Sequence, residues 1–301
     1  LLQGLLVLFA LYTITFFLAK AMPGEPFTSE KNVSVETKAN IRKLYGLDRP
    51  IWEQYYVYPK NIITEGSFGV STSKGRSVGD IIAQSFPNSL LLGLCALGFA
   101  VGIGVPIGVL SAVRRNSWVD WSCMAVAMVG ICVPSFTIGP LLQIYFAAHV
   151  PGLKVAGWGN PQDILLPAFT LGLVAAAYLA RLTRGGILEV LSQDFVRTAR
   201  AKGLSPAKVI IKHSLRGGLI PAVAYLGPAF AALISGSFIV ETIFQVPGMG
   251  QHFVNAATTR DEFLLLGVSL FFGFLIVVMN LLADILTGLL DPRVRIAGQS
   301  D

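Results

Sequence analysis

The sequence contains few residues that could together perform acid–base, nucleophilic or metal chemistry. The three histidines lie far apart along the chain: His149, His213 and His252. The motifs of zinc proteases, serine hydrolases and P-loop nucleotide-binding proteins are absent. Three cysteines, Cys95, Cys123 and Cys132, stand in apolar runs without Cys-x-x-Cys spacing, which favours buried hydrophobes over a disulfide or a zinc site. We therefore expect no catalytic residues, no metal and no cofactor in this chain.

The composition indicates a membrane protein. Of the 301 residues 53% are hydrophobic, and 13% are charged where soluble domains carry about 25%. The formal net charge is +6, which could suggest nucleic acid, but the basic residues are scattered between apolar runs. Membrane proteins gather Lys and Arg on their cytoplasmic side, so we expect a lipid bilayer and no nucleic acid as partner.

Six stretches lack Asp, Glu, Lys and Arg. They are Leu1–Ala19, Ile81–Val113, Trp121–Leu153, Ile164–Ala180, Gly217–Val240 and Phe263–Ala283. A helix needs about 20 residues to cross the hydrocarbon, and no run alternates with the period of a strand. The sequence therefore predicts an all-α polytopic membrane protein with six transmembrane helices, the second of which begins near Pro87-Asn88-Ser89.

The first apolar run has a competing interpretation. Ala19-Lys20-Ala21 resembles the cleavage site of a signal peptide. No charged segment precedes the run, however, and the run is longer than the apolar part of most signal peptides. We favour a membrane anchor, and the apolar start is consistent with a short basic leader before Leu1.

The basic residues also predict the orientation. Twelve of the 23 lie in Arg114–Asp120, Arg181–Arg216 and the tail, whereas the short loops on the other side hold only Lys154 and Arg260. We expect both termini to be cytoplasmic. The predicted organisation is a first helix in residues 1–20, an external segment in 21–86, and a five-helix core in 87–301 with a cytoplasmic loop at 181–218. Within the external segment, Ser34–Tyr45 predicts a short helix and Gly66–Gly69 a turn.

Polar residues inside the apolar runs have two interpretations, interhelical hydrogen bonds or pore lining. They are Gln143, Ser235, Ser237, Asn280 and Asp284. Ionisable residues are nearly missing from the middle of the runs, which disfavours an ion-coupled carrier. A self-sufficient channel or secondary carrier remains the alternative to a subunit that depends on partners.

The basic segment after residue 181 is punctuated by helix signals. Asp194 is a good N-cap, so we expect a helix over Phe195–Lys202 that ends at Gly203. Ser205 and Pro206 predict a second helix that ends near Gly217-Gly218 before Pro221 opens the fifth membrane helix. A solvated loop, a helix lying on anionic lipid and a chance helix-turn-helix are the alternatives.

A family resemblance appears in this segment. Arg197-Thr-Ala-Arg-Ala-Lys-Gly203, followed by Leu219-Ile-Pro221, resembles the cytoplasmic signature of permeases of binding-protein-dependent ABC importers. Arg197 and Thr198 stand where that signature usually has Glu and Ala, a departure shared with the peptide-importer branch. Further matching motifs are Pro23–Thr28, Tyr45–Pro50, Gly66–Gly69, Val133–Phe136, Arg181–Arg184, Glu241–Phe244, Pro247–Gly250 and Asp291–Arg295. Together they resemble the first permease subunit of oligopeptide and dipeptide importers, and Pro-Phe-Thr at 26–28 favours oligopeptide systems over dipeptide, nickel or other small-solute systems.

The resemblance implies a type I importer permease fold in the bacterial cytoplasmic (inner) membrane and transport of peptide by alternating access. It implies a second homologous permease subunit, an external peptide-binding protein, and two cytoplasmic ATPase subunits that bind ATP and Mg. It also implies that the short helix docks on an ATPase. The expected coupling residues are Asp194, Phe195, Val196, Arg197, Thr198, Ala199, Arg200, Ala201, Lys202 and Gly203. Among them, we expect apolar contact with the ATPase through Phe195, Val196 and Ala199.

Overall fold

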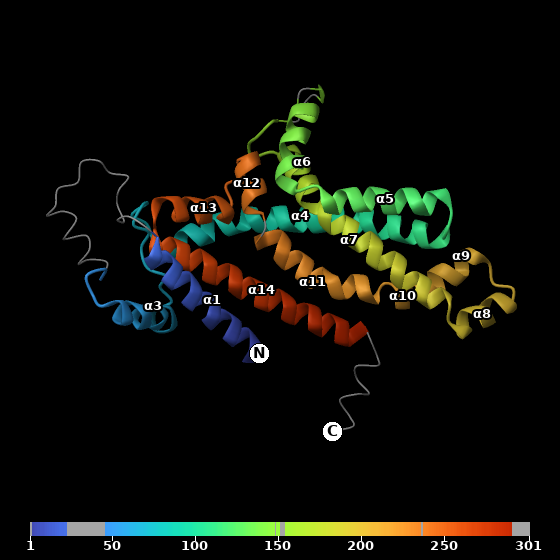
Figure 1. Cartoon of the computed structure of the whole chain (residues 1–301), viewed down its shortest axis with the longest axis horizontal. Helices are drawn as coiled ribbons and strands as arrows, with labels where there is room; N and C mark the ends of the chain where they lie inside the picture. The colour runs from blue at the N-terminus through green and yellow to red at the C-terminus, as the bar shows by residue number, and fades with distance from the viewer. Residues whose placement is uncertain (1, 23–45, 148, 151–153, 236, 291–301) are drawn as a thin grey trace, which may run out of the picture. The chain divides into compact units, whose positions relative to one another are not determined.

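The structure is a computed structural model that describes residues 2–22, 46–147, 149–150, 154–235 and 237–290, and the described residues are almost entirely helical (Figure 1). They divide into two compact units, residues 1–90 with 246–277 and residues 91–245 with 278–301. Two long helices, α4 (Val78–Val113) and α14 (Glu262–Leu290), contribute residues to both units. The only β pairing among the described residues is an isolated antiparallel bridge between Val70 and Ser77.

The first unit contains α1 (Leu2–Ala21), α3 (Ile51–Glu65), α13 (Met249–Thr259) and the adjoining parts of α4 and α14. Its core is aromatic. Tyr12 and Phe16 of α1 pack with Tyr58 of α3 and Leu266 of α14. The rings of Tyr12 and Tyr58 are stacked with centroids 5.9 Å apart. Tyr12 also donates a hydrogen bond of 2.6 Å to the Tyr55 carbonyl, so α3 is fixed to α1 by both apolar and polar contacts.

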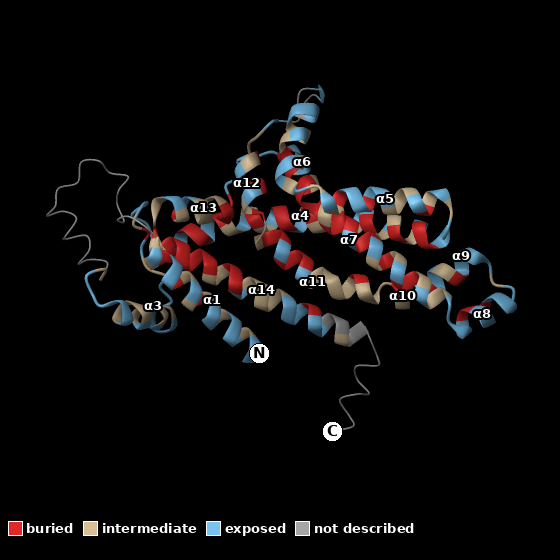
Figure 2. Cartoon of the chain, in the orientation of Figure 1, coloured by how far each residue is buried: buried red, intermediate tan, exposed pale blue. Residues whose placement is uncertain are grey.

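The second unit is built around α7 (Leu165–Leu191), whose buried residues follow its length in Figure 2. Its helices are α5 (Trp118–Cys132), α6 (Ser135–Leu142), α8 (Asp194–Ala201), α9 (Pro206–Lys208), α10 (Leu215–Gly218), α11 (Ile220–Ser235) and α12 (Phe238–Phe244). Short π segments cover Gln143–Ala147 and Val209–Ser214, and a 3-10 turn covers Pro161–Ile164.

Helices α4 and α7 approach closely in this unit because small residues face each other. A side chain on Gly104 would overlap the carbonyl oxygen of Ala176, and one on Gly108 would overlap that of Ala180. This spacing of four places both glycines on one face of α4. Such small-residue faces are a common way for membrane helices to pack, since lipid provides no hydrophobic drive for association.

The six expected spans correspond to helices of the structure. Four single helices are long and apolar enough to cross a membrane, and the count rises to six if each of two bent helix pairs is one span. The pairs are residues 118–132 with 135–146, and residues 206–218 with 220–235. The prediction of an all-α, multi-span fold is confirmed.

The first bent pair owes its 101° bend to Val133 and Pro134. Val133 is extended, with φ −88° and ψ 120°, because the residue before a proline avoids the helical region. Pro134 precedes α6 and Ser135 is its first residue. The long uncharged run that begins at Trp121 is therefore a broken element.

Two predicted boundaries are wrong. The second helix begins at Val78, not near Pro87, and Asp80 occupies its first turn. Pro87 lies inside α4, since apolar helices tolerate the missing N–H better than the soluble ones from which the rule derives. The loop predicted from Arg181 begins only after Leu191, because α7 continues through Arg181 and Arg184.

The cysteines are less buried than expected. None of the cysteines is fully buried, and Cys132 is exposed, so they are not the buried hydrophobes we expected. The helix expected over residues 34–45 and the motifs at residues 23–28 and 291–295 lie outside the described residues.

Candidate functional site

Helix α8 is the short basic helix that the sequence predicts, displaced by one residue. Gln193 precedes it in an extended conformation, and its carbonyl accepts from the N–H of Val196. Asp194 is thus the first helical residue and not the cap. Its carboxylate still lies at the positive end of the helix, and it is 3.5 Å from a guanidinium nitrogen of Arg197. Both side chains are exposed, so this ion pair contributes little stability.

Gly203 ends the turn after α8, as predicted. Its φ is +77°, in the left-handed region that costs a residue with a side chain about 1–2 kcal/mol. The N–H of Gly203 donates to the Arg200 carbonyl at 2.9 Å, and the N–H of Leu204 donates to the Ala199 carbonyl at 3.4 Å. Only the backbone conformation demands glycine here, because a Cβ at this position would meet no atom within 4 Å.

The second predicted helix is present, but its middle is a π-helical segment. Pro206 is the first residue of α9, and the Ser205 carbonyl accepts from Val209 at 3.0 Å without a side-chain cap bond. The π segment Val209–Ser214 connects α9 to α10, and Ser214 donates its hydroxyl to the Val209 carbonyl at 3.2 Å. The sequence predicts where this element begins and ends, but not its π turns.

The apolar face of α8 is buried against its own chain. Val196 is 0% exposed and packs with Ala199 and Val209, and Val190, Leu191 and Leu204 surround them. The expectation that Val196 and Ala199 contact a partner is therefore wrong. These two residues attach α8 to the end of α7 and to the π segment.

The opposite face of α8 is open. Phe195 is 52% exposed, and Arg197, Thr198, Arg200, Ala201 and Lys202 are exposed beside it. This face therefore combines one exposed aromatic side chain with three basic residues, Arg197, Arg200 and Lys202. Of the three residues expected to make apolar contacts, Phe195 alone is exposed, and its contact with a partner stays a prediction.

Two glycines, which lack side chains, allow α10 to approach α7 closely. A side chain on Gly186 would overlap the Gly218 carbonyl, and one on Gly218 would overlap the backbone of Ile187. By contrast, a Cβ on the neighbouring Gly185 would meet nothing within 4 Å. The backbones of the two helices are therefore in direct contact, and this contact holds the segment after α8 against α7.

A partly buried ion pair joins α5 to α7, and no local signal in the sequence predicts it. The Arg184 Nε and Nη2 atoms donate to the two oxygens of Asp120, at 2.7 and 2.8 Å. Asp120 also accepts from the Ser111 hydroxyl and, at 3.0 Å, from the Asn116 N–H. The carboxylate is 5% exposed, so this bidentate pair fixes α7 and the α4–α5 turn to each other.

Comparison with known proteins agrees with this architecture. Residues 104–296 match the family described as "Binding-protein-dependent transport system inner membrane component", and residues 1–93 match its N-terminal companion. The chain belongs to this family. It is therefore a multi-pass inner membrane transport component, as its apolar helices require.

Relatives of this transport component match it over almost its whole length. It is 43% identical to "Oligopeptide transport system permease protein OppB" of Haemophilus influenzae, over 98% of this chain and 97% of the relative. It is 41% identical to "Dipeptide transport system permease protein DppB" of Bacillus subtilis, over 94% and 92%. Among solved structures, an inward-facing MetNI methionine ABC transporter shares its fold, with a TM-score of 0.58 at 19% identity over 70% of this chain and 96% of the other.

The polar residues expected to bind helices together or to line a pore fall into two groups in this transport component. Gln143 donates to the carbonyls of Val155 and Ile243, at 2.6 and 3.0 Å, and so ties separate segments together. Ser235 donates to the Ala231 carbonyl of its own helix, and Ser237 is buried and donates to Glu241.

Asn280 and Asp284 are different. They stand four residues apart on α14, and both side chains are exposed. The structure therefore supports an interhelical role for Gln143, whereas the roles of Asn280 and Asp284 stay predictions.

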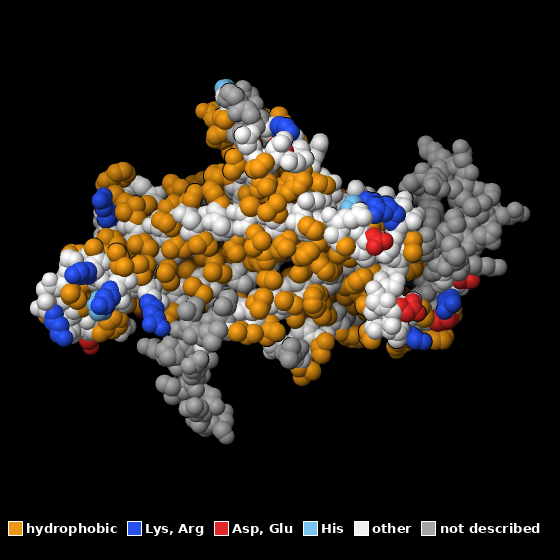
Figure 3. All heavy atoms as spheres, turned by 180° about the vertical axis from the view of Figure 1, so that it is seen from behind, with side chains coloured by type: hydrophobic (Ala, Val, Ile, Leu, Met, Phe, Trp, Pro, Cys, Tyr) orange, Lys and Arg blue, Asp and Glu red, His pale blue; other side chains and the backbone are white. Residues whose placement is uncertain are grey.

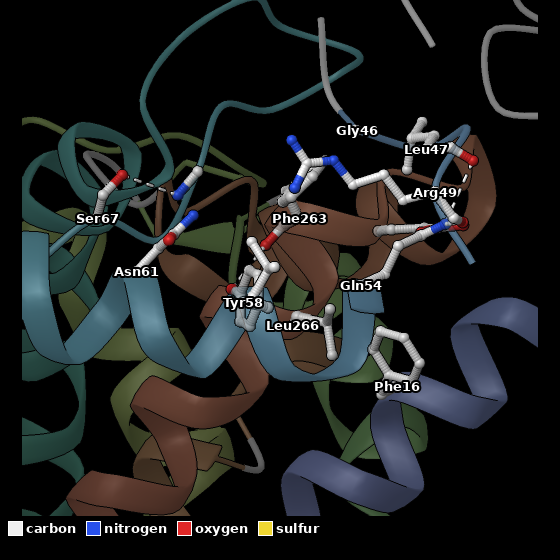
Figure 4. Close-up of a pocket in the computed structure, with 13 residues that line it drawn as sticks. Phe16, Gly46, Leu47, Arg49, Gln54, Tyr58, Asn61, Ser67, Phe263 and Leu266 are labelled. Carbon is white, nitrogen blue, oxygen red and sulfur yellow. Dashed lines mark hydrogen bonds between the residues drawn. The ribbon is translucent and has the colours of Figure 1, made fainter. Parts of the chain in front are cut away.

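A pocket of about 220 Å³ lies in the first unit between α1, α3 and the start of α14 (Figure 4). Phe16, Tyr58, Phe263 and Leu266 form its apolar wall, and Arg49, Gln54 and Asn61 are among its polar residues. Burial raises the pKa of Tyr58 far above its usual range, so this phenol stays neutral. Among the described residues no group of His, Cys, Asp and Glu side chains could hold a metal ion.

Proposed function

We propose that this chain is the first permease subunit of an ATP-driven peptide importer. It would form half of the translocation pathway together with a second homologous permease. Two ATPase subunits would bind ATP and Mg, and an external binding protein would deliver the peptide. The proposal is supported by relatives named as peptide-system permeases over nearly the full chain. The structural observation that carries it is the open face of α8 around Phe195, on a helix seated firmly on α7.

The geometry supports a mechanical role for α8. A push on its open face would pass through Val196 and Ala199 to the end of α7, because these residues pack on that end. The Gly186–Gly218 contact would move α10 with α7, and the Asp120–Arg184 pair would carry α5 along. Closure of the ATPases would thus move several helices together, which is what alternating access requires.

Oligopeptide transport is the finer proposal. Pro26-Phe27-Thr28 follows the pattern of oligopeptide systems, and the relatives named OppB in Haemophilus influenzae and in Escherichia coli are 43% and 42% identical. We further propose that both termini and α8 face the cytoplasm, where the ATPases lie. The basic side chains at Arg197, Arg200 and Lys202 support this side, since short cytoplasmic loops are enriched in Lys and Arg.

The experiment is a reconstituted complex with and without Phe195→Asp. Placing a carboxylate at this exposed position leaves the fold of the chain intact, but it should lower peptide-stimulated ATP hydrolysis at least tenfold, because a charge in a packed contact is costly. Ile63→Asp on α3 is the matched control, since Ile63 is 83% exposed and far from α8 in sequence. Wild-type stimulation in Phe195→Asp, or a response governed by the content of anionic lipid alone, would contradict the coupling role.

A further inference from the structure

A second pocket in the first unit is basic and is built from segments far apart in sequence. It has a volume of about 330 Å³. It is lined by Lys74, Arg76, Ile81, Gln84, Ser85, Asn88, Pro247 and His252. None of these eight residues is acidic, and four carry nitrogen donors on long or amide side chains. At the right of Figure 3, over α13 and the start of α4, Lys and Arg side chains stand beside a histidine, with an acidic side chain next to them.

The hairpin of residues 70–77, which carries Lys74 and Arg76, is held in place by hydrogen bonds to Asp261. Ser71 and Ser73 donate their hydroxyls to Asp261, which is 0% exposed, and the Ser73 N–H donates to the same oxygen at 2.9 Å. The other oxygen of Asp261 accepts from the N–H of Leu264 at 3.1 Å. Asp261 therefore offsets part of the positive charge, but its oxygens are occupied by the fold. A second carboxylate, that of Asp80, is exposed on the first turn of α4 and does not line the pocket.

The Asn88 amide donates to the Pro247 carbonyl at 2.9 Å, whereas the donors of Lys74 and Arg76 are only partly used. Lys74 Nζ lies 2.8 Å from His252 Nδ1, which must accept this hydrogen bond because an ammonium has no lone pair. Arg76 gives one Nη2 bond of 2.9 Å to Gln84, out of the five N–H donors of a guanidinium. Burial and the neighbouring cations Lys74 and Arg76 lower the pKa of His252 to about 4, so the ring is neutral at pH 7.

Lys74 and Arg76 are both exposed to solvent at the rim of the pocket. Partial desolvation and the charge of Arg76 lower the pKa of Lys74, and Asp261 raises it as a lesser contribution. Two neighbouring cations beside neutral donors form a site that would attract an anion. A cavity of this size exceeds one carboxylate and accommodates the end of a chain.

We propose that this pocket binds the C-terminal carboxylate of the transported peptide, an inference that rests on the proposed peptide transport. Arg76 and Lys74 would pair with the carboxylate oxygens, and the amides of Gln84 and Asn88 would lie beside the last peptide group. Every linear peptide ends in a carboxylate whatever its sequence. A transporter that tolerates many side chains could therefore recognise all its substrates by this one group.

The test uses one peptide in two forms, with a free C-terminal carboxylate and with a C-terminal amide. The complete complex is reconstituted with its binding protein, and peptide concentrations are set so that the binding protein is equally loaded with either form. The measurements are uptake and stimulated ATP hydrolysis. We expect the wild-type complex to take up the free acid about tenfold faster, because the amide cannot pair with the two cations.

The double variant Lys74→Met/Arg76→Gln should abolish this preference by lowering uptake of the free acid to the level of the amide. Lys60→Met, which removes an exposed lysine on α3 outside the pocket, should keep it. Lys74→Arg, which retains the charge, should also keep it. These two variants separate loss of the carboxylate contact from general damage to the unit.

Three results would overturn the proposal. Equal losses for both peptide forms in the double variant would assign the pocket to structure or to docking of the binding protein. A preference that follows the anionic lipid content of the vesicles, and not the peptide terminus, would assign it to phosphate headgroups. No preference in the wild-type complex would also exclude it. Failure of the proposed function itself looks different, because the wild-type complex would then take up neither peptide form.

Discussion

Asp120 and Asp261 are both buried carboxylates, but the two units satisfy them in different ways. Asp120 in the second unit pairs with the guanidinium of Arg184 and joins two helices. Asp261 in the first unit receives hydrogen bonds from Ser71, Ser73 and Leu264, and fixes a hairpin. The first arrangement suits a region that must transmit force as one body. The second holds a loop in shape, and the cations Lys74 and Arg76 on that loop contact the neutral side chains of His252 and Gln84 instead of the carboxylate.

The largest effect should come from breaking the ion pair. Asp120→Ala would leave the Arg184 side chain, which is 29% exposed, without its carboxylate, at a cost of about 2–3 kcal/mol, because the guanidinium loses two hydrogen bonds while water can replace only part of them. We expect a marked drop in the thermal unfolding temperature of the purified complex. Asp120→Leu combined with Arg184→Met should restore most of the loss, because no charge is then left unpaired. If the double variant is no more stable than the single one, the pair has another role.

Replacement of the second carboxylate should cost less. Asp261→Asn keeps one oxygen acceptor but places an NH₂ group where donors from Ser71, Ser73 or Leu264 point, for a loss of about 1–3 kcal/mol. Limited proteolysis should then cut within residues 70–77 at least several-fold faster. Asp80→Asn is the control, since Asp80 is exposed on the adjoining helix. Unchanged proteolysis in Asp261→Asn would show that the hairpin does not depend on this carboxylate.

Neither carboxylate contact could be predicted from the sequence. Arg184 is 64 residues from Asp120, and Ser71 is 190 residues from Asp261, so no local pattern connects these pairs. In contrast, α8, the turn at Gly203 and the start of α9 at Pro206 follow from signals within a few residues. Local signals were misleading at two other places, the start of α4 and the end of α7. Pro87 and Arg181 carry local signals of a helix boundary, but α4 and α7 continue through them.

Two adjacent glycines give a matched pair for the transmitting region. Gly186→Ala would place a methyl group against the Gly218 carbonyl and force α10 away from α7, at about 1–3 kcal/mol. Gly185→Ala has free space and should be neutral or slightly stabilising, because alanine favours the helix. The measurement is assembly with the ATPases and stimulated hydrolysis. Equal behaviour of the two variants would show that the α7–α10 contact is not required.

A smaller effect is expected from pH in the first unit. The unfolded chain protonates His252 near pH 6.5, whereas the folded chain does so only near a pKa of about 4. Between these two values the unfolded chain binds the proton more readily than the folded chain does. The free energy of unfolding is therefore highest above about pH 6.5 and falls as the pH is lowered toward 4. His252→Asn should flatten the dependence of unfolding on pH in this window. An unchanged pH profile in the variant would contradict the environment described for this ring.

The central claim, that α8 attaches to its own chain by one face and to an ATPase by the other, has a direct test. Single cysteines are placed at Phe195, Val196, Thr198 and Ala199 in a chain whose native cysteines are replaced by alanine. Cross-linking to the ATPases is then measured in the reconstituted complex. The account predicts high yields at Phe195 and Thr198 and little at Val196 and Ala199, which are buried against Val209. Equal yields at all four positions, or a maximum at Ala199, would contradict it.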